Sequence, residues 1–166
     1  MAIVVPTPNT TITSAWGKSV ADAINGAIPR ELAYAQVTAS KTVTATAENV
    51  ADLVVAAPAL TFDGTIAVNI EVFTPAAVPA PAVGAALHLW LYQDGVSIGR
   101  LAALTNPAAA SFACPVTASR RLVPTAGSHT FSFAATAPAG GNGNIAAGTG
   151  GAGQYMPAYI RITRAA

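Results

Sequence analysis

Side chains that could serve as metal ligands or nucleophiles are few in this sequence and far apart. Its 166 residues include two histidines, His88 and His129, one cysteine, Cys114, and seven acidic residues that form no cluster. A structural or catalytic metal site needs several such groups converging on one ion. We therefore predict no metal site within one chain. The alternative that stays open is a site on a threefold axis where three His88 side chains meet.

Two segments contain parts of catalytic or cofactor motifs but lack the surroundings that these motifs need. Ser128-His129 supplies two residue types of a catalytic triad, yet no nucleophile elbow or oxyanion-hole sequence surrounds it. Residues 148–153 match G-x-G-x-x-G, a fingerprint that binds a pyrophosphate only where a helix follows. Here a predicted strand follows instead, and no two acids are arranged like a glycosidase pair. We expect no enzyme activity and no cofactor.

The composition excludes some partners and favours others. Only 9% of the residues are charged, against roughly 25% in soluble domains. The net charge is +1 and the longest basic run is Arg120-Arg121, so we exclude nucleic acid, which needs a basic patch. The longest apolar stretch, residues 76–92, is interrupted by prolines and His88, and we expect no membrane span and no signal peptide. So little charge indicates a surface that other protein covers in part.

A β-hairpin over residues 87–104, with its turn at Asp94-Gly95, is the most regular element that could present side chains. Successive side chains of a strand alternate between its two faces. The row of leucines in residues 87–91 would face the core, and the other row is formed by His88, Trp90 and Tyr92. Because exposed apolar patches mark interfaces, we predict that this second row contacts another subunit. The alternative is that Trp90 and Tyr92 line a second core layer of the same protomer.

From Tyr34 onward the hydrophobic pattern has a period of two, which predicts strands. Three groups of apolar residues form predicted buried rows: Ile66, Val68, Ile70 and Val72; Phe131 and Phe133; Ile160 and Ile162. Many short strands separated by Gly, Pro and Asn turns predict an all-β fold, an antiparallel jelly-roll sandwich. Two loops stand out, a stiff one at residues 75–81 and a glycine-rich one at residues 138–153.

Residues 1–30 differ from the rest of the chain. A Pro/Thr-rich arm precedes a predicted short helix that ends near Asn25. The apolar stripe of this helix is Trp16, Val20 and Ile24, at i, i+4 and i+8. A helix this short needs packing partners. We predict an attachment segment over residues 1–30 and a jelly-roll head over residues 31–166; the alternative is that the stripe packs on the chain's own sandwich.

Two parts of the chain resemble virion proteins of tailed bacteriophages. Residues 10–25, with Trp16-Gly17 at their centre, resemble the N-terminal Trp-Gly segment of phage minor tail and fibre proteins. The order of residues 90–100, 121–133 and 159–164, with a glycine-rich loop before the last, is similar to the second half of a C1q/tumour-necrosis-factor-like jelly roll of phage head and tail proteins. The resemblance implies a homotrimer displayed on the virion, with His88, Trp90 and Tyr92 at the trimer interface.

These observations together predict a non-enzymatic structural protein of a tailed bacteriophage virion, used in capsid decoration or as a minor tail protein. Its expected location is the virion surface, after synthesis in the host cytoplasm, and its expected partners are other capsid or tail proteins held through Trp16, Val20 and Ile24. The alternative is a receptor-binding head that recognises a host surface glycan. Its candidate residues are Asn142, Asn144 and Tyr155, since amides and an aromatic ring suit sugars.

Overall fold

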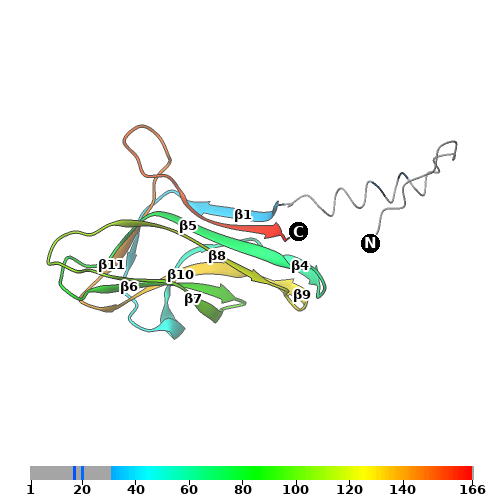
Figure 1. Cartoon of the computed structure of the whole chain (residues 1–166), viewed down its shortest axis with the longest axis horizontal. Coiled ribbons are helices and arrows are strands. Elements are labelled where there is room, and N and C mark those ends of the chain that lie inside the picture. The colour runs from blue at the N-terminus through cyan, green and yellow to red at the C-terminus, as the bar shows by residue number, and fades with distance from the viewer. Residues whose placement is uncertain (1–16, 18–19, 21–30, 166) are drawn as a thin grey trace.

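A computed structural model describes Gly17, Val20 and residues 31–165, and Figure 1 shows the course of the chain. Residues 31–165 form twelve β-strands and one short 3-10 helix, η1 (Glu48–Val50). The first six strands are β1 (Glu31–Val37), β2 (Lys41–Val43), β3 (Asp52–Ala56), β4 (Leu60–Asp63), β5 (Val68–Val78) and β6 (Ala86–Gln93). The other six are β7 (Val96–Thr105), β8 (Cys114–Leu122), β9 (Ala126–His129), β10 (Phe131–Ala139), β11 (Gly143–Ala146) and β12 (Ala158–Arg164).

Two antiparallel sheets lie face to face (Figure 1). The first sheet has the order β1-β12-β5-β8. β8 pairs along one edge of β5. The other edge of β5 is shared: β12 pairs with its residues 68–73 and β11 with its residues 76–78, and β2 pairs with the free edge of β11. The second sheet has the order β3-β10-β6-β7, and β4 and β9 form a separate two-stranded ladder.

The strand pairing is nested. β1 pairs with β12, β3 with β10, β5 with β8 and β6 with β7. Strands at the two ends of the sequence thus pair with each other, and so do the strands on either side of its middle. A long hairpin wrapped into two antiparallel sheets in this way is the jelly-roll arrangement. The predicted all-β antiparallel jelly-roll sandwich is therefore confirmed, whereas its assignment to the C1q/tumour-necrosis-factor type stays a prediction.

The core lies between the inner faces of the two sheets, and it contains the predicted rows. The leucines of β6 are at most 1% exposed. The other fully or almost fully buried members are Val68, Ile70, Val72, Phe131, Phe133, Ile160 and Ile162, while Ile66 precedes β5 and is half-buried. Full burial of such a side chain contributes about 1.5–3 kcal/mol. These rows fix the register of each strand, because a slip of one residue would turn them to solvent.

The prediction of a stiff loop over residues 75–81 is wrong, because β5 continues through Pro75 to Val78. The pairing of β5 with β8 is irregular between Thr74 and Ala77. Pro75 lies at that irregularity, where its missing N–H breaks no ladder bond. The predicted glycine-rich loop likewise contains a strand, β11, which pairs with both β2 and β5.

The predicted attachment segment lies outside the described residues except for Gly17 and Val20, which are helical. Trp16 and Ile24 are not among the described residues, so the stripe of Trp16, Val20 and Ile24 stays a prediction. No helix in the described part of the chain has the length and apolar character needed to cross a membrane.

Candidate binding site on the second sheet

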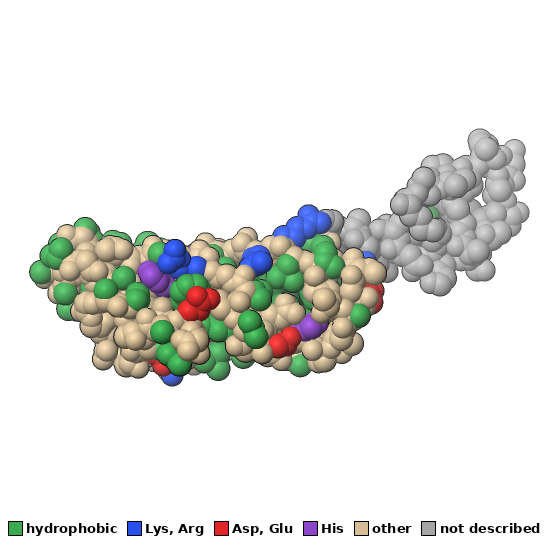
Figure 2. Space-filling model, turned by 90° about the horizontal axis from the view of Figure 1, so that it is seen from below, with side chains coloured by type: hydrophobic (Ala, Val, Ile, Leu, Met, Phe, Trp, Pro, Cys, Tyr) green, Lys and Arg blue, Asp and Glu red, His purple; other side chains and the backbone are tan. Residues whose placement is uncertain are grey.

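The outer face of the second sheet carries the aromatic row of β6, and Figure 2 shows the molecule from that side. His88 and Trp90 are half-buried, and Tyr92 is only 8% exposed. Other parts of the same chain provide this burial, as the contacts of each residue show below. The role of His88, Trp90 and Tyr92 in a trimer interface stays a prediction.

Trp90 is fixed by three neighbours on the sheet surface. Its indole N–H donates to Thr136 Oγ1 of β10 at 3.0 Å. The guanidinium carbon of Arg100 lies 5.7 Å from the centre of the Trp90 ring, and the His88 ring meets it edge-on at 6.0 Å. Burial, assisted by the charge of Arg100, lowers the pKa of His88. Since its N–H is already bonded and a cation lies over its ring, Trp90 is held on the sheet surface and is not a free platform for a ligand.

Tyr92 holds η1 against the sheet. Its hydroxyl donates a hydrogen bond to the backbone carbonyl of Glu48, and η1 also lies against β7. Burial, with a smaller effect of the Glu48 charge, raises the pKa of Tyr92. No side chain caps η1 at its N-terminus, so the tyrosine hydroxyl is a principal tether of this short helix.

Asp52 closes the segment that contains η1. Its Oδ2 accepts hydrogen bonds from the backbone N–H groups of Thr44 at 2.6 Å and Ala45 at 2.9 Å, and from the Thr44 hydroxyl at 3.3 Å. The bond from Ala45 is the largest cause of the lowered pKa of Asp52. The carboxylate thus fixes both ends of residues 44–52, because it lies at the start of β3 and binds the chain that follows β2.

Two hollows lie beside Tyr92, one against the start of η1 and the other against its end. The larger, about 480 Å³, is lined by Glu48, Asn49, Tyr92, Gly95, Val96 and Ser97. The smaller, about 340 Å³, shares Asn49, Tyr92 and Gly95 with it and extends over Val50, Ala51, Leu53, Ser132 and Ala134. The hairpin turn forms one wall: Asp94 and Gly95 have φ values of 53° and 78°, as a two-residue type I′ turn requires.

The lining of the hollows is mixed in character. Glu48 supplies a carboxylate and Asn49 an amide, while the Ser97 hydroxyl oxygen is buried without a hydrogen-bond partner. Because that oxygen is closed to solvent, Ser97 lines the hollow through its other atoms, and the side-chain groups that can reach a ligand are those of Glu48 and Asn49. Large apolar side chains stay exposed beside these polar groups, with Leu53 at 53%, Val50 at 62% and Val96 at 66%. The site can therefore bind a ligand with both hydroxyl groups and apolar faces.

Sequence reasoning did not find Asn49 or Ser97. Asn49 lies between two predicted strands and belongs to no motif. Ser97 lies in a strand, and the residues that line the hollow with it include Glu48 and Asn49, which are distant in the sequence. Only the crossing of η1 over β6 and β7 brings the two together. The sequence signals nearby were Tyr92 in the aromatic row and the Asp94-Gly95 turn, and the structure confirms the turn.

The residues predicted for a sugar-binding loop lie elsewhere and in different environments. Asn142 is exposed before β11, Asn144 is half-buried within β11, and Tyr155 is 51% exposed. Tyr155 follows the tip of a loop that projects beyond the first sheet (Figure 1). Two backbone hydrogen bonds close this loop, from the Gly148 N–H to the Met156 carbonyl and from the Gly150 N–H to the Tyr155 carbonyl. A glycan site at Asn142, Asn144 and Tyr155 stays a prediction.

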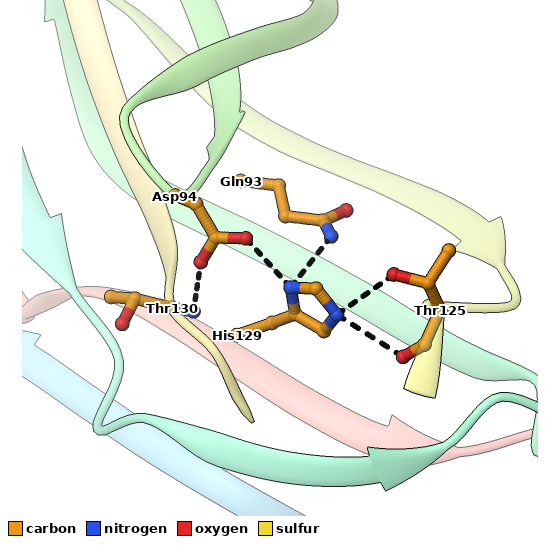
Figure 3. Close-up of polar contacts among 5 residues, drawn as sticks. All are labelled: Gln93, Asp94, Thr125, His129 and Thr130. Atoms are coloured by element: carbon orange, nitrogen blue, oxygen red, sulfur yellow. Dashed lines mark hydrogen bonds and ion pairs between the residues drawn. The ribbon is translucent and has the colours of Figure 1, made fainter. Parts of the chain in front are cut away.

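His129 has an acidic partner, although not the arrangement of a serine triad. Its Nδ1 lies 2.6 Å from Asp94 Oδ2, and Figure 3 shows its Nε2 facing Thr125 on the other side of the ring. Among the described residues no three His, Cys, Asp or Glu side chains are placed to hold a metal ion. Cys114 is half-buried and packs against the core.

No protein-family model and no curated protein matches this chain. Among solved structures it is similar to the C-terminal domain of EclA, a sugar-binding protein, with 20% identity and a TM-score of 0.36 over 66% of this chain and 74% of that one. It is also similar to the carbohydrate-binding module CBM6cm-2 of Cellvibrio mixtus lichenase 5A, solved with cellotriose, at 15% identity and a TM-score of 0.28 over 82% and 91% of the two chains. A third is the C-terminal CBM6 of LamC from Zobellia galactanivorans, at 17% identity and a TM-score of 0.30 over 78% and 98%. Because these identities and TM-scores are low, they carry no argument about function, and the chain's own strand pairing identifies it as an antiparallel β-sandwich.

Proposed function

We propose that this chain is a non-enzymatic jelly-roll domain that binds a carbohydrate in the two hollows around Tyr92. The observation that carries the proposal is the lining of these hollows, in which the exposed polar groups of Glu48 and Asn49 stand beside exposed apolar side chains. Small-molecule sites combine a concave, largely apolar surface with a few directional polar groups. A sugar matches both, because its hydroxyls need donors and acceptors and its C–H faces need apolar contact.

The size and arrangement of the hollows favour an oligosaccharide over a single sugar unit. Both volumes, about 480 and 340 Å³, lie within the range of roughly 300–1,000 Å³ that ligand pockets occupy. Asn49, Tyr92 and Gly95 line both hollows, so a chain of sugar units can pass from one to the other along η1. The Asn49 amide, at the shared boundary, can donate to one unit and accept from the next.

A glycan array tests the proposal, with the wild-type chain, Asn49→Ala and Asn142→Ala compared side by side. Both asparagines are exposed, so neither change should affect folding. We expect saturable binding of one glycan class by the wild type, at least tenfold weaker binding by Asn49→Ala, and unchanged binding by Asn142→Ala. Binding that falls with Asn142→Ala instead would place the site in the glycine-rich loop, and no binding to any glycan would contradict the proposal.

A second candidate function is that of a homotrimeric structural subunit on a tailed-phage virion, bound through residues 1–30. The observation that favours it is the scarcity of charge, 9% of all residues, together with the exposed Val50, Leu53 and Val96 on one face. Sedimentation of the wild type and of Leu53→Glu tests it, with Val123→Glu, equally exposed at 54%, as control. A trimer that only Leu53→Glu disrupts would support this function, and a monomeric wild type would contradict it.

A further inference from the structure

An ion pair at one end of the sandwich joins three chain segments at a single point (Figure 3). His129, at the end of β9, contacts Asp94 in the β6–β7 turn through Nδ1 at 2.6 Å. Its Nε2 lies 3.1 Å from the backbone carbonyl oxygen of Thr125, which follows β8. Asp94 is bound further to Thr130, whose N–H donates to Oδ1 at 2.8 Å and whose carbonyl accepts from the Asp94 N–H at 2.9 Å.

The partners of the imidazole indicate that it carries two protons. The carboxylate oxygen 2.6 Å from Nδ1 and the carbonyl oxygen 3.1 Å from Nε2 only accept hydrogen bonds, so these two contacts are complete when both nitrogens of His129 donate. Gln93 Nε2, 3.0 Å from the same Nδ1, can only donate, and it gains a bond to Nδ1 only when that nitrogen is bare. The Thr125 hydroxyl lies 3.0 Å from the same Nε2. When the ring loses a proton, that hydroxyl can donate to the bare nitrogen, while the bond to the carbonyl and the charge of the pair are lost. Deprotonation therefore weakens the contact, and water can replace the imidazole at the carbonyl because Thr125 is exposed.

We propose that the His129–Asp94 ion pair is a pH-dependent clamp that positions the hairpin turn forming one wall of the hollows around Tyr92. The turn residue after Asp94 is Gly95, which lines both hollows, and Val96 and Ser97 line the larger one. His129 itself lines neither, so it acts as a positioning residue. Its effect on ligand affinity rests on the proposed function, whereas its effect on the turn does not.

The groups that face the imidazole set the direction of the pH response. They are Gln93 at the end of β6, Asp94 in the β6–β7 turn, Thr125 from the β8–β9 connection, and Phe62 of β4, whose ring centre lies 6.1 Å away. Asp94 is the titratable one among them, and its hydrogen bond raises the pKa of His129, while His129 in turn lowers the pKa of Asp94. A raised histidine pKa means that the clamp is complete at pH values below about 6.5 and weakens as pH rises through the higher folded value. A lowered aspartate pKa means that it weakens again in acid, below 3.8.

Amide NMR spectra recorded from pH 5 to 9 test the clamp without any ligand. We expect the signals of Gly95, Val96 and Ser97 to shift with one midpoint above 6.5, the same midpoint as the His129 ring protons. Asp94→Asn should lower that midpoint, because asparagine lacks the charge that raises the pKa of His129. The turn itself should be kept, since asparagine tolerates a positive φ. His129→Gln should abolish the shift, and His88→Gln should preserve it, since the pKa of His88 is lowered instead. If His129→Gln does not fold, Asp94→Asn carries the test alone.

The clamp is overturned if the turn signals do not titrate, or if they titrate unchanged in Asp94→Asn. Affinity for an array-positive glycan, measured at pH 6 and pH 8.5, separates the two proposals. We expect binding about threefold to tenfold weaker at the higher pH, as a charge-assisted bond becomes a neutral one. Turn signals that titrate in a chain that binds no glycan would support the clamp and contradict the proposed function. Glycan binding with turn signals that do not titrate would do the reverse.

Discussion

Replacement of Tyr92 by phenylalanine removes one hydroxyl and tests how η1 is held over the hollows. Tyr92 is 8% exposed and its hydroxyl donates to the Glu48 carbonyl. The remaining backbone bonds of η1, from Val50 to Ala47 and from Ala51 to Glu48, are long at 3.2 Å each. The tyrosine hydroxyl should therefore contribute measurably both to folding and to the shape of the site.

The magnitude follows from what each partner does after the change. A neutral hydrogen bond contributes about 0.5–1.5 kcal/mol net, and more is lost only when a partner stays buried without a bond. Glu48 is exposed, so water can replace the hydroxyl at its carbonyl. We expect Tyr92→Phe to lower the free energy of unfolding by about 1 kcal/mol, or the melting temperature by about 3 °C. If all of this energy positions η1 for the ligand, affinity falls by up to about fivefold.

Denaturant unfolding of the wild type, Tyr92→Phe and Tyr155→Phe measures this effect. Tyr155 is 51% exposed and its hydroxyl has no hydrogen bond in the described part of the chain, so Tyr155→Phe should change stability by less than about 0.5 kcal/mol. Equal stabilities of the two variants would refute the reasoning, because they would show that the hydroxyl does not hold η1.

Three other changes test two contacts near the site and the geometry of the loop at residues 148–156. Trp90→Phe leaves the hydroxyl of Thr136, only 1% exposed, without its donor; unfolding free energy should fall by about 1–3 kcal/mol, and no loss would contradict the role of the indole N–H. Asp52→Asn should lower the free energy of unfolding by about 1 kcal/mol at pH 7. Because the pKa of Asp52 is lowered from 3.8, the difference in stability from wild type should vanish as pH falls through the pKa of the folded state. Unfolding experiments from pH 2 to pH 7 measure this difference, and a difference that persists at pH 2 would contradict the role of the charge. Gly148→Ala places a methyl group 2.5 Å from a backbone oxygen across the loop and should destabilise by about 1–3 kcal/mol. Gly151→Ala, with its nearest atom at 3.9 Å, should be neutral in the same thermal unfolding assay, and equal effects would contradict the loop geometry.

Sequence periodicity predicted the sandwich because burial of one strand face leaves a period-two trace. The leucines of β6 and the phenylalanines of β10 show this, and their rows are buried as expected. The turn at Asp94-Gly95 was also predictable, since few residues accept two successive positive φ values. The loop predicted from Pro75 was wrong, because a proline ends a strand only where its missing N–H would face a partner strand, and the sequence does not show that pairing.

The candidate site was less predictable, because it is made by contacts between distant segments. Trp90 and Tyr92 were found from the alternation of β6, but that pattern shows only which way they point and not what covers them. Tyr92 is covered by η1, about forty residues earlier in the chain. The partnership of His129 with Asp94 depends in the same way on the pairing of β6 with β10. That pairing puts Gln93 opposite Phe131 and so brings the β6–β7 turn beside the start of β10.

The most direct test of the central claim is an amide NMR titration of the chain with an oligosaccharide that is positive on the array. We predict saturable shifts of the Asn49, Gly95 and Ser97 signals, with those of residues 142–156 unchanged. Shifts confined to residues 142–156 would contradict a binding site in the hollows around Tyr92.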